Sequence, residues 1–273
     1  MKVLAFPQFM RNTMKKLLFG AIACMAILTS AAMSRAALVD VSVQFENLSP
    51  TNGISYAPIH VGFGNGTFDG FDNGSVAPAP IVTLAELGSG ADWLPAFVAA
   101  EPNAVTGSLG GGPILPGASA SGTFRVDTDV NPFFTFAGMV LPSNDLFIGN
   151  DNPQAFRIFD NAGGLAINQI DQTGAQIWDA GSEQAIANNA AFIAGANAGN
   201  RVAENGVVSF ELTELQTYNG LQTGAGYTFD SSLVSGATPI GRFSFSVTAV
   251  PEPTSAALLG VALVGFSLRR RRA

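Results

Sequence analysis

The stretch from Leu141 to Gln184 decides the fold and reads LPSNDLFIGNDNPQAFRIFDNAGGLAINQIDQTGAQIWDAGSEQ. Short apolar runs rich in Phe and Ile alternate in it with Asn, Asp and Gly, which is typical of β-strands joined by turns. Two acidic clusters, Asn144-Asp145 and Asp179–Glu183, each lie at the edge of an apolar run. Such side chains repel one another unless a cation lies between them, and calcium takes carboxylate and carbonyl oxygens as ligands. The alternative interpretation is that both clusters are solvated turn residues.

The β pattern continues through the rest of the central chain. Residues 38–48 (LVDVSVQFENL) and 240–247 (IGRFSFSV) alternate apolar and polar side chains with a period of two, which predicts half-buried strands. The 31 Gly and 15 Pro among 273 residues suit a domain with many turns. We therefore predict an all-β domain, an antiparallel β-sandwich, over residues 37–249. Its other predicted strands are residues 54–61, 123–126, 132–141, 207–215 and 227–233.

A few segments of the domain depart from the strand pattern. Residues 80–100 carry apolar side chains at helical spacing and predict one or two short helices, broken near residues 88–90. The Gly- and Pro-rich residues 107–122 predict a long loop. Residues 183–200, rich in Ala, Asn and Gly, predict a mobile excursion with a short helical turn. For His60, the only histidine in the chain, we predict a structural hydrogen-bonding role rather than a catalytic one.

The central domain is strongly acidic. Between residues 37 and 250 the chain has four arginines, no lysine and 19 acidic residues, which gives this part a net charge of −15. Nucleic acids and anionic lipids are bound through Lys and Arg that neutralise phosphate, so this charge excludes nucleic-acid binding. The same charge favours divalent cations.

Several motifs of the domain resemble the spondin amino-terminal domain, a β-sandwich of extracellular matrix proteins. The paired signature is PSNDLFIG (residues 142–149) with WDAGSE (residues 178–183). The resemblance implies a calcium ion bound by Asp145, Asp179 and Glu183, with the Ala180 carbonyl as a fourth ligand. Glu183 stands where the family usually has Asp, and the chain lacks the cysteines of the animal domains. Further matches, in the family's order, are IHVGFGNGTFDGFDNGS (59–75), LAELG (84–88), SGTFRVD (121–127) and FTFAGMVLPSND (134–145).

The N-terminal residues have the composition of a secretory signal peptide. Met14-Lys15-Lys16 is followed by an apolar run over residues 17–28 and by the small residues of Ser34-Arg35-Ala36. This predicts a signal peptide over residues 1–36, cleaved by signal peptidase after Ala36, with the true start at Met1 or at Met14. The only cysteine, Cys24, lies inside it, so the mature chain is predicted to have no disulfide.

The C-terminal residues 250–273 form a separate segment. A Pro-Glu-Pro sequence precedes an apolar run at residues 256–268 and a cluster of arginines. The run is short of the roughly 20 residues that span a bilayer comfortably, and arginines stay on the cytoplasmic side. A marginal membrane anchor is therefore one interpretation, and the segment as a whole resembles the PEP-CTERM sorting signal. The residues that carry the resemblance are Pro251, Glu252, Pro253, Arg269, Arg270, Arg271 and Arg272.

That resemblance implies a route out of the cell. It implies export through the inner membrane of a Gram-negative bacterium that makes exopolysaccharide, with transient anchoring by a short C-terminal transmembrane helix. An exosortase would then recognise the segment and cleave near the Pro-Glu-Pro sequence. The expected location is the cell surface or the extracellular biofilm matrix, and the expected partners there are a surface protein or exopolysaccharide.

Three function classes follow from these patterns: a calcium-stabilised adhesion or binding module, a secreted polysaccharide-active hydrolase, and a soluble ligand-binding protein. The sequence has no GxSxG elbow, no HExxH and no cysteine nucleophile in the mature chain. Paired carboxylates could perform glycoside hydrolysis, but 19 acidic residues make some such pair unavoidable. We therefore predict a non-catalytic adhesion module.

Overall fold

The structure is a computed structural model of the chain, and it describes residues 38–160, 163–197 and 199–250. Residues Ala37–Ala249 form one compact unit. The predicted signal peptide, the sorting residues from Pro251 onward and the short C-terminal transmembrane helix lie outside the described residues. In the described part of the chain, no helix is long and apolar enough to cross a membrane.

Two antiparallel β-sheets form the unit. The four-stranded sheet has the order β5, β1, β11, β8, and the seven-stranded sheet has the order β10, β9, β7, β6, β3, β4, with β2 paired to β6. In the first sheet the strands are β1 (Leu38–Glu46), β5 (Ser119–Asp127), β8 (Gln169–Thr173) and β11 (Pro239–Ala249). In the second sheet they are β2 (Ser55–Tyr56), β3 (Ile59–Gly64), β4 (Val105–Leu109), β6 (Phe133–Leu141), β7 (Leu146–Gly149), β9 (Trp178–Asp179) and β10 (Ser209–Phe210).

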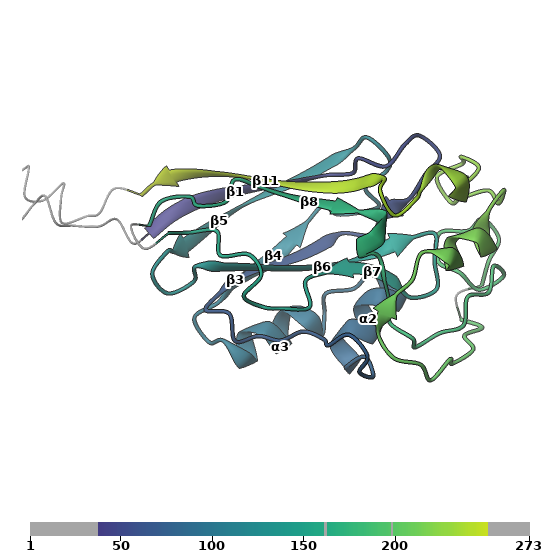
Figure 1. Ribbon diagram of the computed structural model, residues 1–273, viewed down its shortest axis with the longest axis horizontal. Coiled ribbons are helices and arrows are strands. Elements are labelled where there is room, and N and C mark those ends of the chain that lie inside the picture. Colours follow the sequence, from purple (N-terminus) through teal and green to yellow (C-terminus); the bar gives the residue numbers. More distant parts are fainter. Residues whose placement is uncertain (1–37, 161–162, 198, 251–273) are drawn as a thin grey trace, which may run out of the picture. The chain divides into compact units, whose positions relative to one another are not determined.

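The sheets stack face to face, and two helices cover the outer face of the larger sheet (Figure 1). These are α2 (Ala79–Leu87) and α3 (Trp93–Ala100). The remaining helical elements are short 3-10 turns at Gly174–Gln176, Thr213–Tyr218 and Ser231–Leu233. The predicted all-β class, with antiparallel sheets in a sandwich and short helices beside it, is confirmed.

The main core fills the space between the two sheets. The alternation predicted for β1 is observed, since Val41, Val43 and Phe45 are fully buried while their neighbours are half-buried or exposed. From the facing strands, the rings of Phe134 in β6 and Phe243 in β11 meet edge to face, with centroids 5.4 Å apart. Apolar burial of this kind is the main favourable contribution to the stability of a sandwich.

A second core joins the larger sheet to the helices. Trp93 and Phe97 of α3 pack on Phe68, and the Phe68 and Phe97 rings stack with centroids 4.4 Å apart. The break between the helices is at Gly88, which has a φ of 63° and donates its N–H to the Leu84 carbonyl at 2.8 Å. A left-handed glycine of this kind is a common helix C-terminus, so the predicted break is confirmed. Because Ala37–Ala249 contains both cores complete, we treat it as an independently folding domain.

Two of the predicted strands are wrong in most of their length. In residues 207–215 only Ser209–Phe210 is a strand, and a 3-10 helix begins at Thr213. The reason is the burial of Leu215 and Tyr218, which lie three residues apart and point to one side only when the chain is helical. In residues 227–233 the structure has an isolated bridge at Thr228 and a 3-10 turn at Ser231–Leu233.

The predicted loop at residues 107–122 is also wrong at both ends. Strand β4 includes Gly107, and β5 begins at Ser119. Gly107 reads as a loop residue, yet it is needed for packing, because a Cβ added there would lie 2.7 Å from the ring of Phe124. A glycine inside a strand can thus mark close approach of a neighbour instead of a turn.

The chain enters and leaves the domain at the same end of the sandwich. Val39 near the start of β1 pairs with Ala249, the last residue of β11. The loop between β6 and β7 lies at the opposite end, where Leu141 pairs with Ser55 and the Tyr56 hydroxyl donates to the carbonyl of Ile240. The site described next is therefore at the end of the sandwich that is remote from both chain ends.

Candidate functional site

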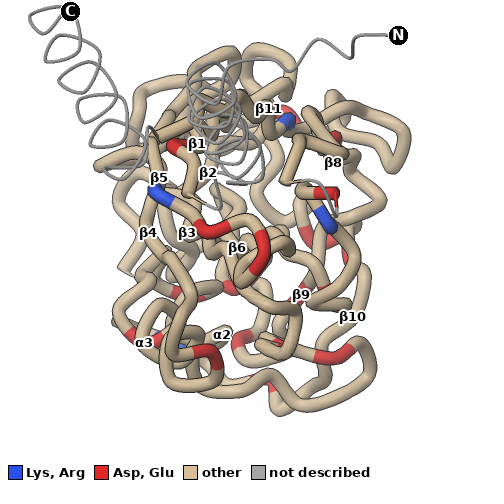
Figure 2. Tube along the Cα trace, turned by 90° about the vertical axis from the view of Figure 1, so that its left-hand side faces the viewer, with Lys and Arg blue, Asp and Glu red and all other residues tan. Residues whose placement is uncertain are grey.

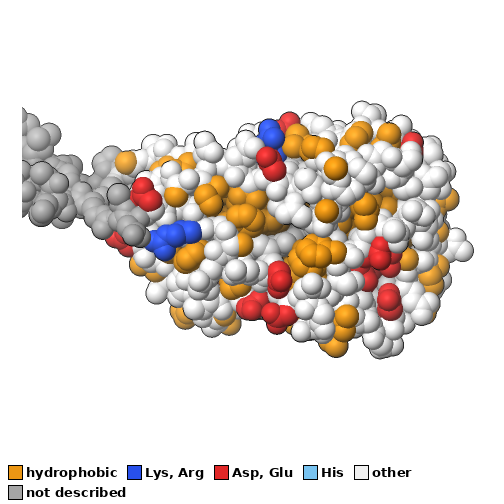
Figure 3. All heavy atoms as spheres, viewed as in Figure 1, with side chains coloured by type: hydrophobic (Ala, Val, Ile, Leu, Met, Phe, Trp, Pro, Cys, Tyr) orange, Lys and Arg blue, Asp and Glu red, His pale blue; other side chains and the backbone are white. Residues whose placement is uncertain are grey.

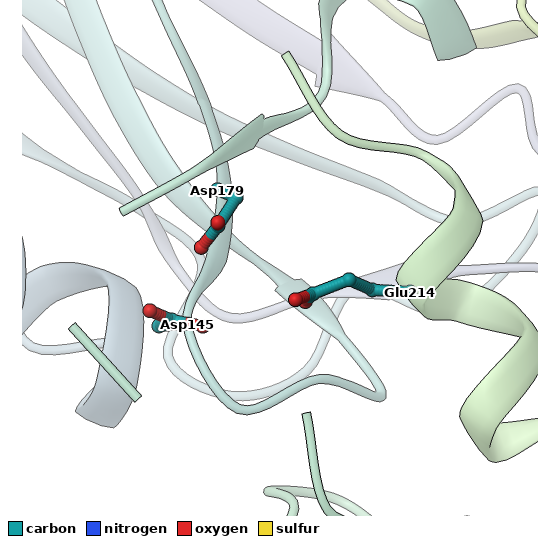
Figure 4. Close-up of side chains that lie close together, drawn as sticks. All are labelled: Asp145, Asp179 and Glu214. Carbon is teal, nitrogen blue, oxygen red and sulfur yellow. The ribbon is translucent and has the colours of Figure 1, made fainter. Parts of the chain in front are cut away.

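Three carboxyl groups converge at this remote end of the sandwich. They belong to Asp145, Asp179 and Glu214, and one oxygen of each lies within 4.8 Å of the others. Figure 4 shows the three side chains pointing toward the space between them. Asp145 is fully buried and Asp179 is 6% exposed, while Glu214 is half-buried. We refer to these residues as the carboxylate cluster.

Three separate segments bring the cluster together. Asp145 directly precedes β7, and Asp179 is the last residue of β9. Residue Asp179 pairs with Leu146 in the sheet, so the ladder itself sets the two aspartates side by side. Glu214 comes from the 3-10 helix Thr213–Tyr218, which is held against the domain by the buried Leu215 and Tyr218.

Backbone N–H groups hold one oxygen of each aspartate. Asp145 Oδ2 accepts hydrogen bonds from the N–H groups of Ser182 and Glu183, at 2.8 and 2.9 Å, and from the Ser182 hydroxyl at 3.0 Å. Asp179 Oδ1 accepts from the N–H of Gly181 at 2.7 Å. The turn after β9 therefore orients both carboxylates, as is expected of groups that must stay in a fixed position.

Two carboxylate oxygens of the cluster are left without a hydrogen-bond partner. Within the described residues, Asp145 Oδ1 and Glu214 Oε2 are the only buried side-chain polar atoms that make no hydrogen bond. A buried carboxylate oxygen without a donor costs free energy, and such an exception in a folded protein calls for an explanation. An ion bound between the carboxylates would supply the missing partner.

The raised pKa values of the three carboxyl groups also favour a cation between them. Burial raises the pKa of Asp145, and burial together with the charge of Asp145 raises the pKa of Asp179 to about 7. Burial and the charges of Asp179 and Asp145 raise the pKa of Glu214 to about 8. The charged groups that act on Asp179 and Glu214 are all carboxylates. In the described part of the chain, which is coloured in Figure 2, acidic residues lie on many segments and basic residues are few.

A buried polar network surrounds the cluster. The Asn144 side chain donates to Glu183 Oε1 at 3.1 Å and to Asn189 Oδ1 at 2.8 Å. Its Oδ1 accepts from the Tyr218 hydroxyl at 2.8 Å and from the Ile186 N–H at 3.0 Å. Asn144 thus links the segments that carry Asp145, Glu183 and Glu214, which fixes the spacing of the cluster.

Of the four predicted ligands, the structure brings the side chains of two together in the cluster. Asp145 and Asp179 lie together, as the resemblance implies. Ala180 is buried beside them and its N–H donates to the Asp145 carbonyl at 3.3 Å. The carboxylate of Glu183 is not part of the cluster and accepts from Asn144 instead, while its backbone N–H holds Asp145.

Glu214 is the residue that the sequence analysis missed. It lies in a stretch interpreted there as a strand, where Glu214 and its neighbour Glu211 look like ordinary acidic surface residues. The usable signal is the spacing of Leu215 and Tyr218, which fits one side of a helical turn better than one side of a strand.

His60, in contrast, lies away from the cluster and has a structural environment. It is 5% exposed, with Nδ1 in a hydrogen bond to Ser108 Oγ at 2.8 Å and Nε2 in one to the Gly88 carbonyl at 3.2 Å. Burial lowers its pKa, so the neutral ring is favoured. It joins β3, β4 and the end of α2, in keeping with the role expected of it.

Comparison with protein-family models matches residues 249–272 to the PEP-CTERM protein-sorting motif. The matched segment contains the Pro-Glu-Pro sequence and the terminal arginines. No curated protein sequence matches the chain. The motif shows that the chain is targeted to an exosortase, processed during export, and located at the cell surface or outside the cell.

Proposed function

We propose that the exported domain is a non-catalytic binding module of the cell surface or extracellular matrix, stabilised by a calcium ion in the carboxylate cluster. The observation that carries the proposal is the pair of unpartnered buried oxygens, Asp145 Oδ1 and Glu214 Oε2. The resemblance to spondin domains, which serve matrix attachment, supports the same function.

The residues present fit a hard cation. Calcium takes oxygen ligands, including carboxylates, in a flexible geometry, and the cluster offers carboxylate oxygens only. The backbone already orients one oxygen of Asp145 and one of Asp179, so ion binding needs little further ordering of these two side chains. Asp145, Asp179 and Glu214 would hold the ion, and water or carbonyl oxygens would complete its coordination.

The bound ion would stabilise the fold. It would join the start of β7, the end of β9 and the 3-10 helix Thr213–Tyr218, and it would neutralise carboxylates that otherwise repel one another. Burial of the aspartates supports a role outside catalysis, because a glycosidic bond must lie between two accessible carboxyl groups to be hydrolysed. Fully buried Asp145 is not placed to meet a polysaccharide.

Thermal unfolding of residues 37–249 tests the proposal. The domain is treated with EDTA and then melted alone, with calcium and with magnesium. Calcium at about 100 times its dissociation constant stabilises the folded domain by about 2.7 kcal/mol. For a domain of this size, the melting temperature should then rise by about 5–10 °C.

The matched variant is Asp145→Asn, which retains an oxygen that can accept from Ser182 and Glu183 but removes the negative charge. We expect it to fold and to lose most of the calcium-dependent rise. A wild-type melting temperature that is equal in EDTA and in calcium would show that the cluster is not a calcium site. Non-catalytic function has its own test, since the domain should release no reducing sugar from polysaccharides.

A further inference from the structure

A hollow of about 170 Å³ lies at the open side of the sandwich, and none of the three cluster carboxylates is among its lining residues. Strand β8 ends the order of one sheet and β10 ends the order of the other, so the two sheets are not joined on this side. On the face shown in Figure 3, hydrophobic side chains gather along the middle of the molecule, with acidic side chains beside them. Residues of β8, β9, β10 and the loop after β7 line the hollow, which we call the side pocket.

Aromatic rings form one part of the side pocket. Trp178 is 4% exposed, and its indole N–H donates to the Gly149 carbonyl at 3.0 Å. Phe210 stacks on it with ring centroids 3.7 Å apart and an angle of 23° between the planes. Phe210 is nevertheless 53% exposed, so it presents an apolar ring to solvent at the pocket. The buried indole fixes the orientation of that ring.

Neutral amide groups form the other part. Gln172 is only 2% exposed and donates from Nε2 to the Asp171 carbonyl, while its Oε1 makes no hydrogen bond within the described residues. Gln176 Oε1 accepts from the Thr173 N–H, which leaves the Gln176 NH₂ group. Asn152 Oδ1 accepts from the Gln154 N–H, which leaves the Asn152 NH₂ group. These amide side chains therefore offer one acceptor and two donor groups beside an aromatic platform.

We infer that the side pocket binds one pyranose ring of a neutral glycan. A sugar hydroxyl is both donor and acceptor and so pairs with amide oxygens and amide NH₂ groups alike. The C–H face of the ring is apolar and packs on an aromatic side chain. The pocket is small, and a concave site with an aromatic side and a few placed polar groups is typical of small-ligand recognition.

Charge selects the class of glycan. The lining residues include Asp151 and no Arg or Lys. The domain as a whole carries a net charge of −15 between residues 37 and 250. Uronic acids, sulfated sugars and phosphate groups are repelled by such a surface. The three cluster residues do not line the pocket, so the inference goes beyond the proposed calcium site and does not depend on it.

Titration of residues 37–249 with hexaoses of glucose, galactose, mannose and N-acetylglucosamine tests the inference, with an oligogalacturonate as the anionic probe. Tryptophan emission reports on the pocket through Trp178, and calorimetry gives the affinity. Phe210→Ala removes the exposed platform, and Gln172→Met removes the Gln172 acceptor with little change in volume. Leu87→Ala, at an apolar residue of α2 that is 61% exposed against 53% for Phe210, is the matched control.

We expect saturable millimolar binding of at least one neutral hexaose and none of the oligogalacturonate. Phe210→Ala should weaken the affinity at least about tenfold, whereas Leu87→Ala should leave it unchanged. The same affinity should be measured in EDTA and in calcium. Absence of binding to all four neutral hexaoses at about 10 mM would overturn the inference, as would binding that Phe210→Ala leaves intact. Preference for the anionic probe would overturn it as well.

Discussion

Asp145 divides its two carboxylate oxygens between two roles. One oxygen is held by the N–H groups of Ser182 and Glu183, and the other is buried without a hydrogen bond. The hydrogen bonds to the first oxygen keep the side chain in place, and the second oxygen is left able to bind a cation. This asymmetry distinguishes the carboxylate cluster from an acidic turn in water, where both oxygens would be hydrated.

The raised pKa values predict how the stability of the EDTA-treated domain depends on pH. In the unfolded chain Asp179 and Glu214 lose their protons near their usual values of 3.8 and 4.5, but in the fold their pKa values are about 7 and about 8. At pH values between the unfolded and the folded pKa values, the folded state binds more protons than the unfolded state, so stability falls as pH rises. The loss is complete above the folded pKa values.

Melting temperatures measured from about pH 7 to about pH 9 check this expectation, because His60, whose pKa is lowered by burial, is mostly neutral in both states over this range. Without calcium the melting temperature should fall across the range, and Glu214→Gln should make the fall smaller. With saturating calcium the fall should be reduced, because the ion replaces the protons at high pH. A melting temperature that rises with pH in EDTA would contradict the assigned shifts.

At the scale of elements, the turn after β9 positions the cluster. Gly181 has a φ of 63°, and a Cβ added there would lie 2.6 Å from the backbone nitrogen of Val207. Backbone atoms cannot move aside as a flexible side chain can. The same turn supplies the N–H groups that hold Asp145 and Asp179.

Gly181→Ala should therefore lower the free energy of unfolding by about 1–3 kcal/mol and weaken calcium binding. The matched control is Gly74→Ala, where φ is 83° but nothing lies within 4 Å of an added Cβ. It should show the cost of backbone strain alone, about 1–2 kcal/mol, with calcium binding unchanged. Urea unfolding with and without calcium measures both effects. Equal calcium affinity in the two variants would contradict the role given to the turn.

The elements also show how far the sequence could predict this structure. Regular alternation predicted β1 and β11, and helical spacing with Gly88 predicted α2 and α3, because local pattern and burial agree there. Asp145 and Asp179 were predicted together through motifs at two strand ends. Glu214 was not, because its 3-10 helix depends on the tertiary burial of Leu215 and Tyr218. Nor could the sequence show that Glu183 Oε1 accepts a hydrogen bond from the Asn144 side chain.

For the whole molecule, the placement of the chain ends matters. Residue 249 leaves the sandwich at the end remote from the carboxylate cluster, and the sorting motif follows directly, over residues 249–272. Sorting and folding should therefore be separable. Replacement of Pro251, Glu252 and Pro253 by Ala should reduce processing and surface delivery to a small fraction of wild type.

Cell fractionation with an antibody against the domain measures that delivery. In a purified chain of residues 37–255, the same replacements should leave the melting temperature unchanged with and without calcium, since these residues follow the last strand in the sequence. A control that replaces Thr254 and Ser255 by Ala should be delivered normally. Normal delivery of the Pro-Glu-Pro variant would contradict the role of the motif.

Calorimetric titration of calcium into EDTA-treated residues 37–249 tests the central claim most directly, with Glu214→Gln and Glu183→Gln as a matched pair. The cluster predicts one bound ion per chain for the wild type. Affinity should fall at least about tenfold in Glu214→Gln, which loses a ligand charge. It should be nearly unchanged in Glu183→Gln, whose amide oxygen can still accept from Asn144. No binding to the wild type, or loss of binding in Glu183→Gln with retention in Glu214→Gln, would contradict the account.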